Sequence, residues 1–122
     1  MEYASSREQE RIRISFQAVK MGDGLIIRIF NEYSHIGAVA VGEFDNESSR
    51  TSVSVLTRKG HKDDALAQKA AHAVTQISHK PTCVIAGVHL EGITKEEIAL
   101  VIEITDQLID EYLKSIQQTD SH

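Results

Sequence analysis

Three short turns of the sequence combine a histidine with a nearby glycine. They are Ser34-His35-Ile36-Gly37, Gly60-His61-Lys62-Asp63 and Ala86-Gly87-Val88-His89. An imidazole near neutral pH can bind a metal, move a proton or donate a hydrogen bond. A glycine lets a ligand approach the backbone closely, because it lacks Cβ. The shared pattern predicts one binding site made from His35, Gly37, Gly60, His61, Lys62, Asp63, Gly87 and His89.

The second turn has the features of an anion site. Lys62 stands at the start of a predicted helix, where free backbone amides and the helix dipole favour a phosphate or a carboxylate. Asp63 and Asp64 occupy the same place and would repel an anion. The two aspartates therefore also fit a simpler interpretation, in which they cap the helix.

A metal centre is the second hypothesis for these turns. His35, His61 and His89, with Asp63, could hold zinc or a first-row metal with one open position for catalysis. No two histidines are four residues apart, so the ligands would have to meet through the fold alone. A third hypothesis is a structural protein whose histidines only cap turns. The remaining histidines, His72, His79 and His122, fit surface positions.

Sequence periodicity predicts the elements that would position these turns. Alternating polar and apolar residues favour four strands, and a fifth segment is apolar almost throughout. Two segments repeat apolar residues at helical spacing. The order ββββαβα predicts an α+β fold, with an antiparallel sheet of about five strands and both helices on one face. The predicted strands are 11–19, 25–30, 36–44, 51–57 and 82–89, and the predicted helices are 63–78 and 94–116.

Composition narrows the class of protein. The 122 residues, of which 41% are hydrophobic and 25% charged, predict one globular domain over 1–122 with frayed ends at 1–10 and 119–122. A net charge of −5 argues against nucleic-acid binding. We expect a cytoplasmic protein, because the chain shows no secretory signal and no apolar stretch of about 20 residues. Cys83, the lone cysteine, fits a small buried hydrophobe.

The ordered set of turns resembles the LpdD-like family, small proteins associated with gallate decarboxylase. The resemblance rests on His35-Ile36-Gly37, His61-Lys62-Asp63, Ala86-Gly87-Val88-His89 and Ile93-Thr94-Lys95. It extends over roughly 25–113, most of the chain. Proteins of that family often have a proline before the first histidine, where this chain has Ser34.

The resemblance implies an accessory protein that does not itself catalyse decarboxylation. LpdD-like proteins chaperone prenylated FMN for decarboxylases of the UbiD type, so the expected cofactor is prenylated FMN, or FMN itself. The expected partners are such a decarboxylase and a flavin prenyltransferase. The resemblance places His35, Gly37, His61, Lys62, Gly87 and His89 near the flavin. We also expect a homo-oligomer, because one short domain can hardly enclose so large a ligand.

Overall fold

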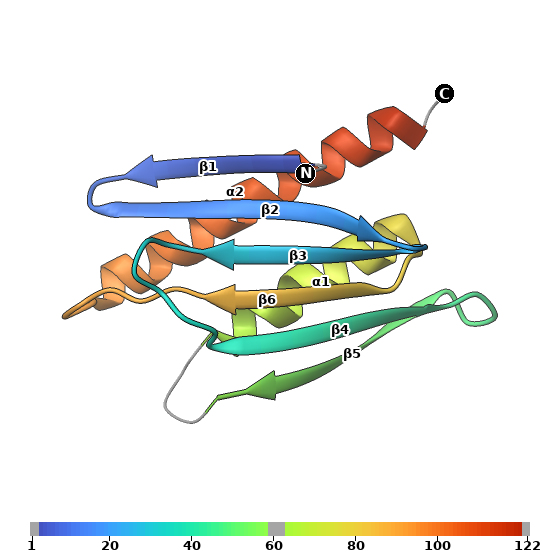
Figure 1. The fold of residues 1–122 in the computed structure, drawn as a ribbon, viewed down its shortest axis with the longest axis horizontal. Helices are drawn as coiled ribbons and strands as arrows, with labels where there is room; N and C mark the ends of the chain where they lie inside the picture. The colour runs from blue at the N-terminus through green and yellow to red at the C-terminus, as the bar shows by residue number, and fades with distance from the viewer. Residues whose placement is uncertain (1–2, 59–62, 121–122) are drawn as a thin grey trace.

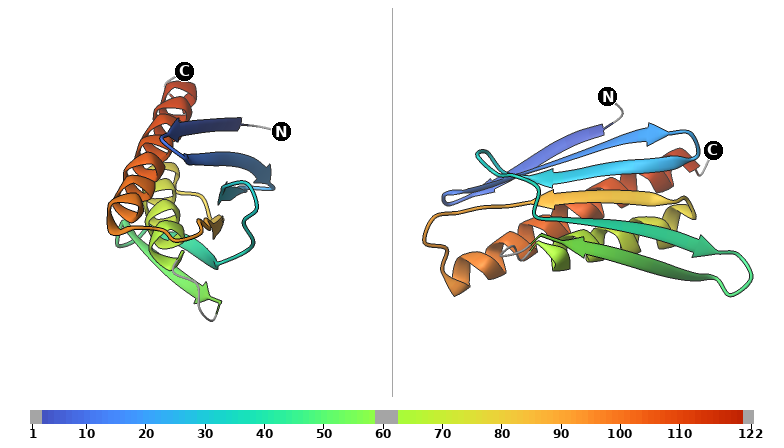
Figure 2. Two further views of the ribbon diagram at one scale, coloured as in Figure 1. Left: turned by 90° about the vertical axis from the view of Figure 1, so that its left-hand side faces the viewer. Right: turned by 60° about the horizontal axis from the view of Figure 1, so that its bottom comes forward.

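A six-stranded sheet with two helices on one of its faces forms the molecule (Figure 1). The computed structural model describes residues 3–58 and 63–120. The α+β class and the placement of both helices on one face are confirmed (Figure 2). The strands are β1 (Tyr3–Gln9), β2 (Ile12–Met21), β3 (Gly24–Phe30), β4 (Ala38–Asp45), β5 (Arg50–Thr57) and β6 (Thr82–Gly87), and the helices are α1 (Asp64–Ser78) and α2 (Lys95–Asp120).

The sheet is mixed, and this differs from the antiparallel sheet of about five strands that the sequence predicts. The strand order is β1-β2-β3-β6-β4-β5. Every neighbouring pair is antiparallel except β3 and β6, which run parallel. After β5 the chain returns along α1, and β6 then enters between β3 and β4 instead of adding to the edge. That insertion makes β6 antiparallel to β4 and parallel to β3.

Strand β1 lies where the sequence predicts a frayed end. Residues 3–9 pair with β2 from Tyr3↔Ala18 to Gln9↔Ile12. The ring of Tyr3 packs against the rings of Phe16 and Tyr112, with centroids 5.9 and 4.8 Å away. The polar sequence of β1 carries no hydrophobic alternation, so its order comes from this pairing and from one aromatic anchor.

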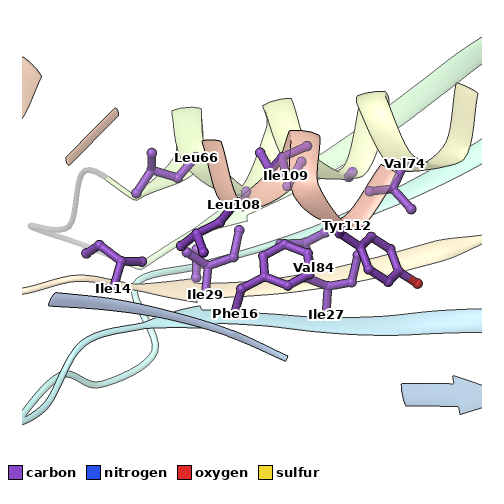
Figure 3. Close-up of a cluster of buried hydrophobic side chains, with 14 of the residues drawn as sticks. Ile14, Phe16, Ile27, Ile29, Leu66, Val74, Val84, Leu108, Ile109 and Tyr112 are labelled. Atoms are coloured by element: carbon purple, nitrogen blue, oxygen red, sulfur yellow. The ribbon is translucent and has the colours of Figure 1, made fainter. Parts of the chain in front are cut away.

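The core fills the space between the sheet and the helices. Phe16, Ile27 and Ile29 of the sheet meet Leu108 and other apolar residues of the helices (Figure 3). Helix α1 turns mostly small side chains inward, so it can lie close to the strands. Burial of such side chains stabilises the fold by roughly 1.5–3 kcal/mol for each large one. The fully buried large residues are Phe16, Ile12, Ile14, Ile27, Ile29, Ile104, Leu108, Val74 and Val84.

Helix α2 begins at the capping box that the sequence predicts. The Glu97 amide donates to Thr94 Oγ1 at 3.1 Å, and the Thr94 amide donates to Glu97 Oε1 at 3.1 Å. These two bonds satisfy amides that a helix start otherwise leaves unpaired. Among the described residues, neither helix has an apolar stretch long enough to cross a membrane.

Cys83 is less buried than the sequence predicts. Strand β6 is central, and Thr82, Val84 and Ala86 are buried under the helices. Cys83 and Ile85 point to the opposite face and are only half-buried. The near-continuous apolar run therefore marks a central strand that the described helices cover on one side only.

Candidate functional site

The parallel pair β3 and β6 ends at one edge of the sheet, and the first and third histidine turns follow there. The last register pair is Phe30↔Gly87. Both arrows point to the same end in Figure 1, where β3 continues into 31–37 and β6 into 88–94. Loops that follow parallel strands meet at the carboxyl end of the sheet, a common place for ligand sites. The parallel pairing is thus what brings His35 and His89 together.

Asn31 joins the two loops. Its Nδ2 donates to the His89 carbonyl oxygen at 2.7 Å, and the His89 amide donates to its Oδ1 at 2.9 Å. The rings of His35 and His89 then lie with centroids 6.1 Å apart and planes inclined at 36°. Both side chains are exposed. His89 Nε2 is also 3.1 Å from Glu91 Oε1.

Gly37 and Gly87 make room for the protein's own groups. A Cβ on Gly87 would overlap the carbonyl oxygen of His35, and a Cβ on Gly37 would overlap the carboxylate of Asp63. The Gly37 amide also donates to the Ala86 carbonyl at 2.9 Å. The sequence predicts that these glycines open the backbone to a ligand. In the structure they let one loop pass directly over the end of β6.

Asp63 connects the start of α1 to the same edge. Its side chain is buried, and Oδ1 accepts from the Val88 amide at 3.0 Å. It stands at the N-cap position of α1 but makes no side-chain capping bond, so the capping interpretation is wrong for Asp63. Asp64 is exposed in the first turn of α1. Asp63 therefore positions the end of β6 and does not face the solvent.

The central part of the second turn, Gly60, His61 and Lys62, lies outside the described residues. The structure describes the residues on either side of it, Arg58 and Asp63. The Arg58 amide donates to the Gly37 carbonyl at 2.9 Å, and Arg58 Nη1 donates to the Ile36 carbonyl at 2.9 Å. Asp63, on the other flank, lies against Gly37. Both described flanks of the second turn thus contact the first turn.

Two cavities adjoin the histidines. The first, of about 400 Å³, involves His35, and the second, of about 310 Å³, involves His89. In the first, the Arg28 guanidinium lies 4.5 Å above the centre of the Phe30 ring. Both volumes fall within the range of roughly 300–1,000 Å³ typical of ligand pockets. The first is lined by Arg28, Phe30, Tyr33, Ile36, Ile85 and Gly87 among others, and the second by Asp63, Leu66, Val88, Leu90, Ile93 and Ile98 among others.

Comparison with known proteins assigns the chain to a family. Residues 8–117 match the model of the prenylated flavin chaperone LpdD-like domain. The chain belongs to the LpdD-like family. The structure is also similar to a chaperone complex for yeast 20S proteasome assembly, with a TM-score of 0.60 and 16% identity over 93% of this chain and 95% of that one. At that identity the likeness shows the shared fold alone. No curated protein matches the chain.

Three residues of the candidate site are absent from the sequence prediction. Arg28 is the one charged residue of β3, Phe30 ends that strand, and Tyr33 lies in the following loop. Tyr33 is 87% exposed and has φ of +66°, which is uncommon for a tyrosine. For Arg28, the sequence signal was a charge inside the apolar run Leu25–Phe30. Only the sheet register places that charge beside Ile85.

The described residues give the metal hypothesis no support. Residues 3–58 and 63–120 contain no group of three side chains able to hold a metal ion. His35 and His89 do meet, but His61, the third expected ligand, lies outside those ranges. Two further histidines of the described residues stand apart from the site: His72 is exposed on α1, and His79 stacks on Phe44 with centroids 3.8 Å apart.

The donor set fits a flavin better than a metal. A flavin mononucleotide combines a flat, largely apolar ring with an anionic phosphate. The first cavity offers Phe30, Ile36 and Ile85 as apolar surface and the guanidinium of Arg28 as a positive charge. Arginine suits a phosphate because its planar fork can donate two parallel hydrogen bonds. His35 adds a ring nitrogen at the rim of the same cavity.

Proposed function

We propose that the chain binds prenylated FMN where β3 and β6 end, and delivers it to a decarboxylase of the UbiD type. Membership of the prenylated flavin chaperone family supports the flavin. The single observation that carries the location is the meeting of His35 and His89 beside the cavity that contains Arg28 and Phe30. FMN itself is the simpler ligand of the same class.

Within this proposal the chain's own residues bind and orient the flavin. Arg28 pairs with negative charge, while Phe30, Ile36 and Ile85 cover one side of the ring. His35 and His89 donate or accept hydrogen bonds at the rim. The proposal gives Gly60, His61 and Lys62 an anion-binding role on the ground of their sequence, and the described residues on either side of them, Arg58 and Asp63, contact the first turn. Gly37, Gly87 and Asp63 position the loops.

A chaperone needs an open site, and the loop at the rim of this one is accessible. His35, Tyr33 and Ile36 are all exposed. Bound cofactor could therefore leave toward a decarboxylase without unfolding of the core. A flavin prenyltransferase is the class of enzyme that would supply the cofactor. The proposal assigns the chain no turnover of its own.

The test is a binding titration followed by a transfer assay. Prenylated FMN and FMN would be titrated anaerobically into the chain, with flavin fluorescence as the readout. We expect Arg28→Ala and His35→Ala to weaken binding by about tenfold, the effect of losing one charge-assisted contact of about 1.4 kcal/mol. His72→Ala is the matched control, since His72 is exposed on α1 away from both cavities.

Transfer is measured as the activity that apo-decarboxylase gains from loaded chain. The gain should exceed that from free cofactor at the same concentration. Equal affinity in Arg28→Ala, His35→Ala and His72→Ala would reject the proposed location. Tight binding without any transfer would reject the chaperone role and leave only a flavin-binding protein.

A further inference from the structure

The face of the sheet opposite the helices is apolar at its centre. We call it the helix-free face (Figure 2). Its apolar side chains alternate with the buried ones along the central strands, and the register makes them adjacent, as in Val19↔Ile26 and Val41↔Cys83. Val41 is 43% exposed and Leu56 is 77% exposed. The apolar residues of the helix-free face include Val19, Met21, Ile26, Phe30, Val39, Val41, Leu56, Cys83 and Ile85.

This face has the size of a stable interface. Six strands about 4.8 Å apart and about eight residues long at 3.3 Å each cover roughly 29 by 26 Å, or about 750 Å². A standard protein interface buries about 800 Å² on each partner. The whole face therefore offers enough surface for a second copy, and adjacent exposed apolar side chains at its centre are typical of an interaction surface.

Two opposite charges flank the apolar centre symmetrically. Ile26 is the partner of Cys83 on the neighbouring strand β3, and Arg28 lies two residues further along β3. Val41 is the partner of Cys83 on the other neighbouring strand, β4, and Glu43 lies two residues further along β4. Because β4 runs antiparallel to β6, this offset is opposite in direction to that of Arg28. Strand spacing puts each about 8 Å from Cys83, on diagonally opposite sides.

That arrangement is self-complementary. In a twofold dimer the same patch contacts itself, so each charge must meet its opposite in the other copy. A twofold axis that passes Cys83 in the plane of the interface, perpendicular to the line from Arg28 to Glu43, places Arg28 of each copy on Glu43 of the other. It also lays the apolar centres of the two sheets against one another, the packing of a β-sandwich.

We propose that two copies of the chain associate through the helix-free face, with the twofold axis next to Cys83. Arg28 also lines the cavity of the candidate site, so the second copy closes one side of that cavity. The dimer does not depend on flavin binding, and its tests use the chain without ligand. Because Arg28 serves in both proposals, His35→Ala, which leaves the proposed interface residues unchanged, tests the flavin site alone, and Val41→Lys without ligand tests the dimer alone.

The first test is the mass of the full chain in solution. Sedimentation at micromolar concentration should give twice the chain mass. Val41→Lys puts a charge at the centre of the face and should raise the dimer dissociation constant by about tenfold or more, because an uncompensated interfacial charge is costly. Val41 is exposed in the single chain, so the Val41→Lys variant should keep a folded circular dichroism spectrum and a cooperative melting transition. A wild-type monomer, or a dimer unchanged by Val41→Lys, would overturn the proposal.

Charge reversal tests the axis. Arg28→Glu and Glu43→Lys should each weaken the dimer, and the double variant should restore it, because the pair then has its signs exchanged. Glu103→Lys, at an exposed position of α2, is the matched control and should leave the mass unchanged. If the double variant dimerises no better than the single variants, Arg28 and Glu43 do not meet and the proposed axis is wrong.

Cys83 provides an independent readout. It is half-buried in the single chain and should be occluded in the dimer. Maleimide labelling should slow as protein concentration rises through the dissociation constant, whereas Val41→Lys should label at one rate throughout. Labelling of the wild type that is independent of concentration, in a sample whose mass is that of a dimer, would place the interface elsewhere and overturn the proposal.

Discussion

The side-chain amide of Asn31 and the backbone of His89 hydrogen-bond to each other twice, at 2.7 and 2.9 Å. This pair holds together two loops that are 58 residues apart in the chain. An asparagine amide can act in this way because it offers a donor and an acceptor side by side. The relative position of the His35 and His89 rings depends on it.

Asn31→Ala should loosen the two loops. We expect a loss of about 1–2 kcal/mol in the free energy of unfolding, since each bond contributes roughly 0.5–1.5 kcal/mol. Flavin affinity should fall as well, because the histidines lose their fixed spacing. Urea unfolding and flavin titration measure the two effects. Asn46→Ala, in the exposed turn after β4, serves as the control. Unchanged amide exchange at His89 would contradict this prediction.

Gly87→Ala should destabilise the protein more than Gly92→Ala. A Cβ at Gly87 would overlap the His35 carbonyl oxygen, so the 31–37 loop must move, at a cost of roughly 1–3 kcal/mol for overpacking. Gly92 has open space around it, and its φ of +59° costs a non-glycine residue about 1 kcal/mol. Thermal unfolding of both variants gives the comparison. The prediction fails if Gly92→Ala is the more damaging change.

Asp63→Ala should leave the Val88 amide without its acceptor. An unsatisfied buried donor costs about 1–3 kcal/mol, and the half-buried Val88 amide should lie toward the lower end of that range, whereas Asp63→Asn keeps a side-chain oxygen and should cost less. Asp64→Ala is the neighbouring control, because Asp64 is exposed. Denaturant midpoints would rank the three variants. A larger loss for Asp64→Ala would mean that helix capping outweighs the contact to β6.

The start of α2 should contribute stability that depends on pH. The hydrogen bond from the Arg11 guanidinium, with the Thr94 amide, lowers the pKa of Glu97 to about 2. The folded pKa lies below the unfolded value of about 4.3, so the contribution is complete above about pH 4.3 and is lost as pH falls toward about 2.

Glu97→Gln should therefore lower the melting temperature near neutral pH, and its difference from the wild type should shrink between about pH 4.3 and about pH 2. Glu96→Gln, at an exposed position of the same first turn, is the control. Melting curves from neutral to strongly acidic pH test the sign. A difference that stays constant over that range would show that the charge of Glu97 does not matter.

Lys62→Ala should weaken flavin binding if the second turn holds the phosphate. A charge-assisted contact contributes roughly 1.5–3 kcal/mol, which corresponds to about tenfold or more in affinity. The loss should shrink at high salt, because an exposed ion pair is screened. Fluorescence titration at low and high salt measures this, with His72→Ala as the reference. Equal affinities of Lys62→Ala and His72→Ala would reject the phosphate-binding turn.

Local patterns in the sequence predict most of the secondary structure and single out the three histidine turns. Alternation and helical spacing are local properties, so 51–57 and 63–78 correspond closely to β5 and α1. The Thr94 and Glu97 capping box is also local, and its bonds are present as predicted. The resemblance carried by the three turns is confirmed by the family match.

Strand pairing and the role of each turn residue could be learned only from the folded chain. The parallel pairing of β3 with β6 depends on contacts between residues more than 50 positions apart, and no local pattern encodes it. That pairing brings Arg28 beside Ile85 and the first histidine turn near the third. It also makes Gly37, Asp63 and Gly87 packing partners, because burial and close approach are properties of two segments together and neither segment shows them alone.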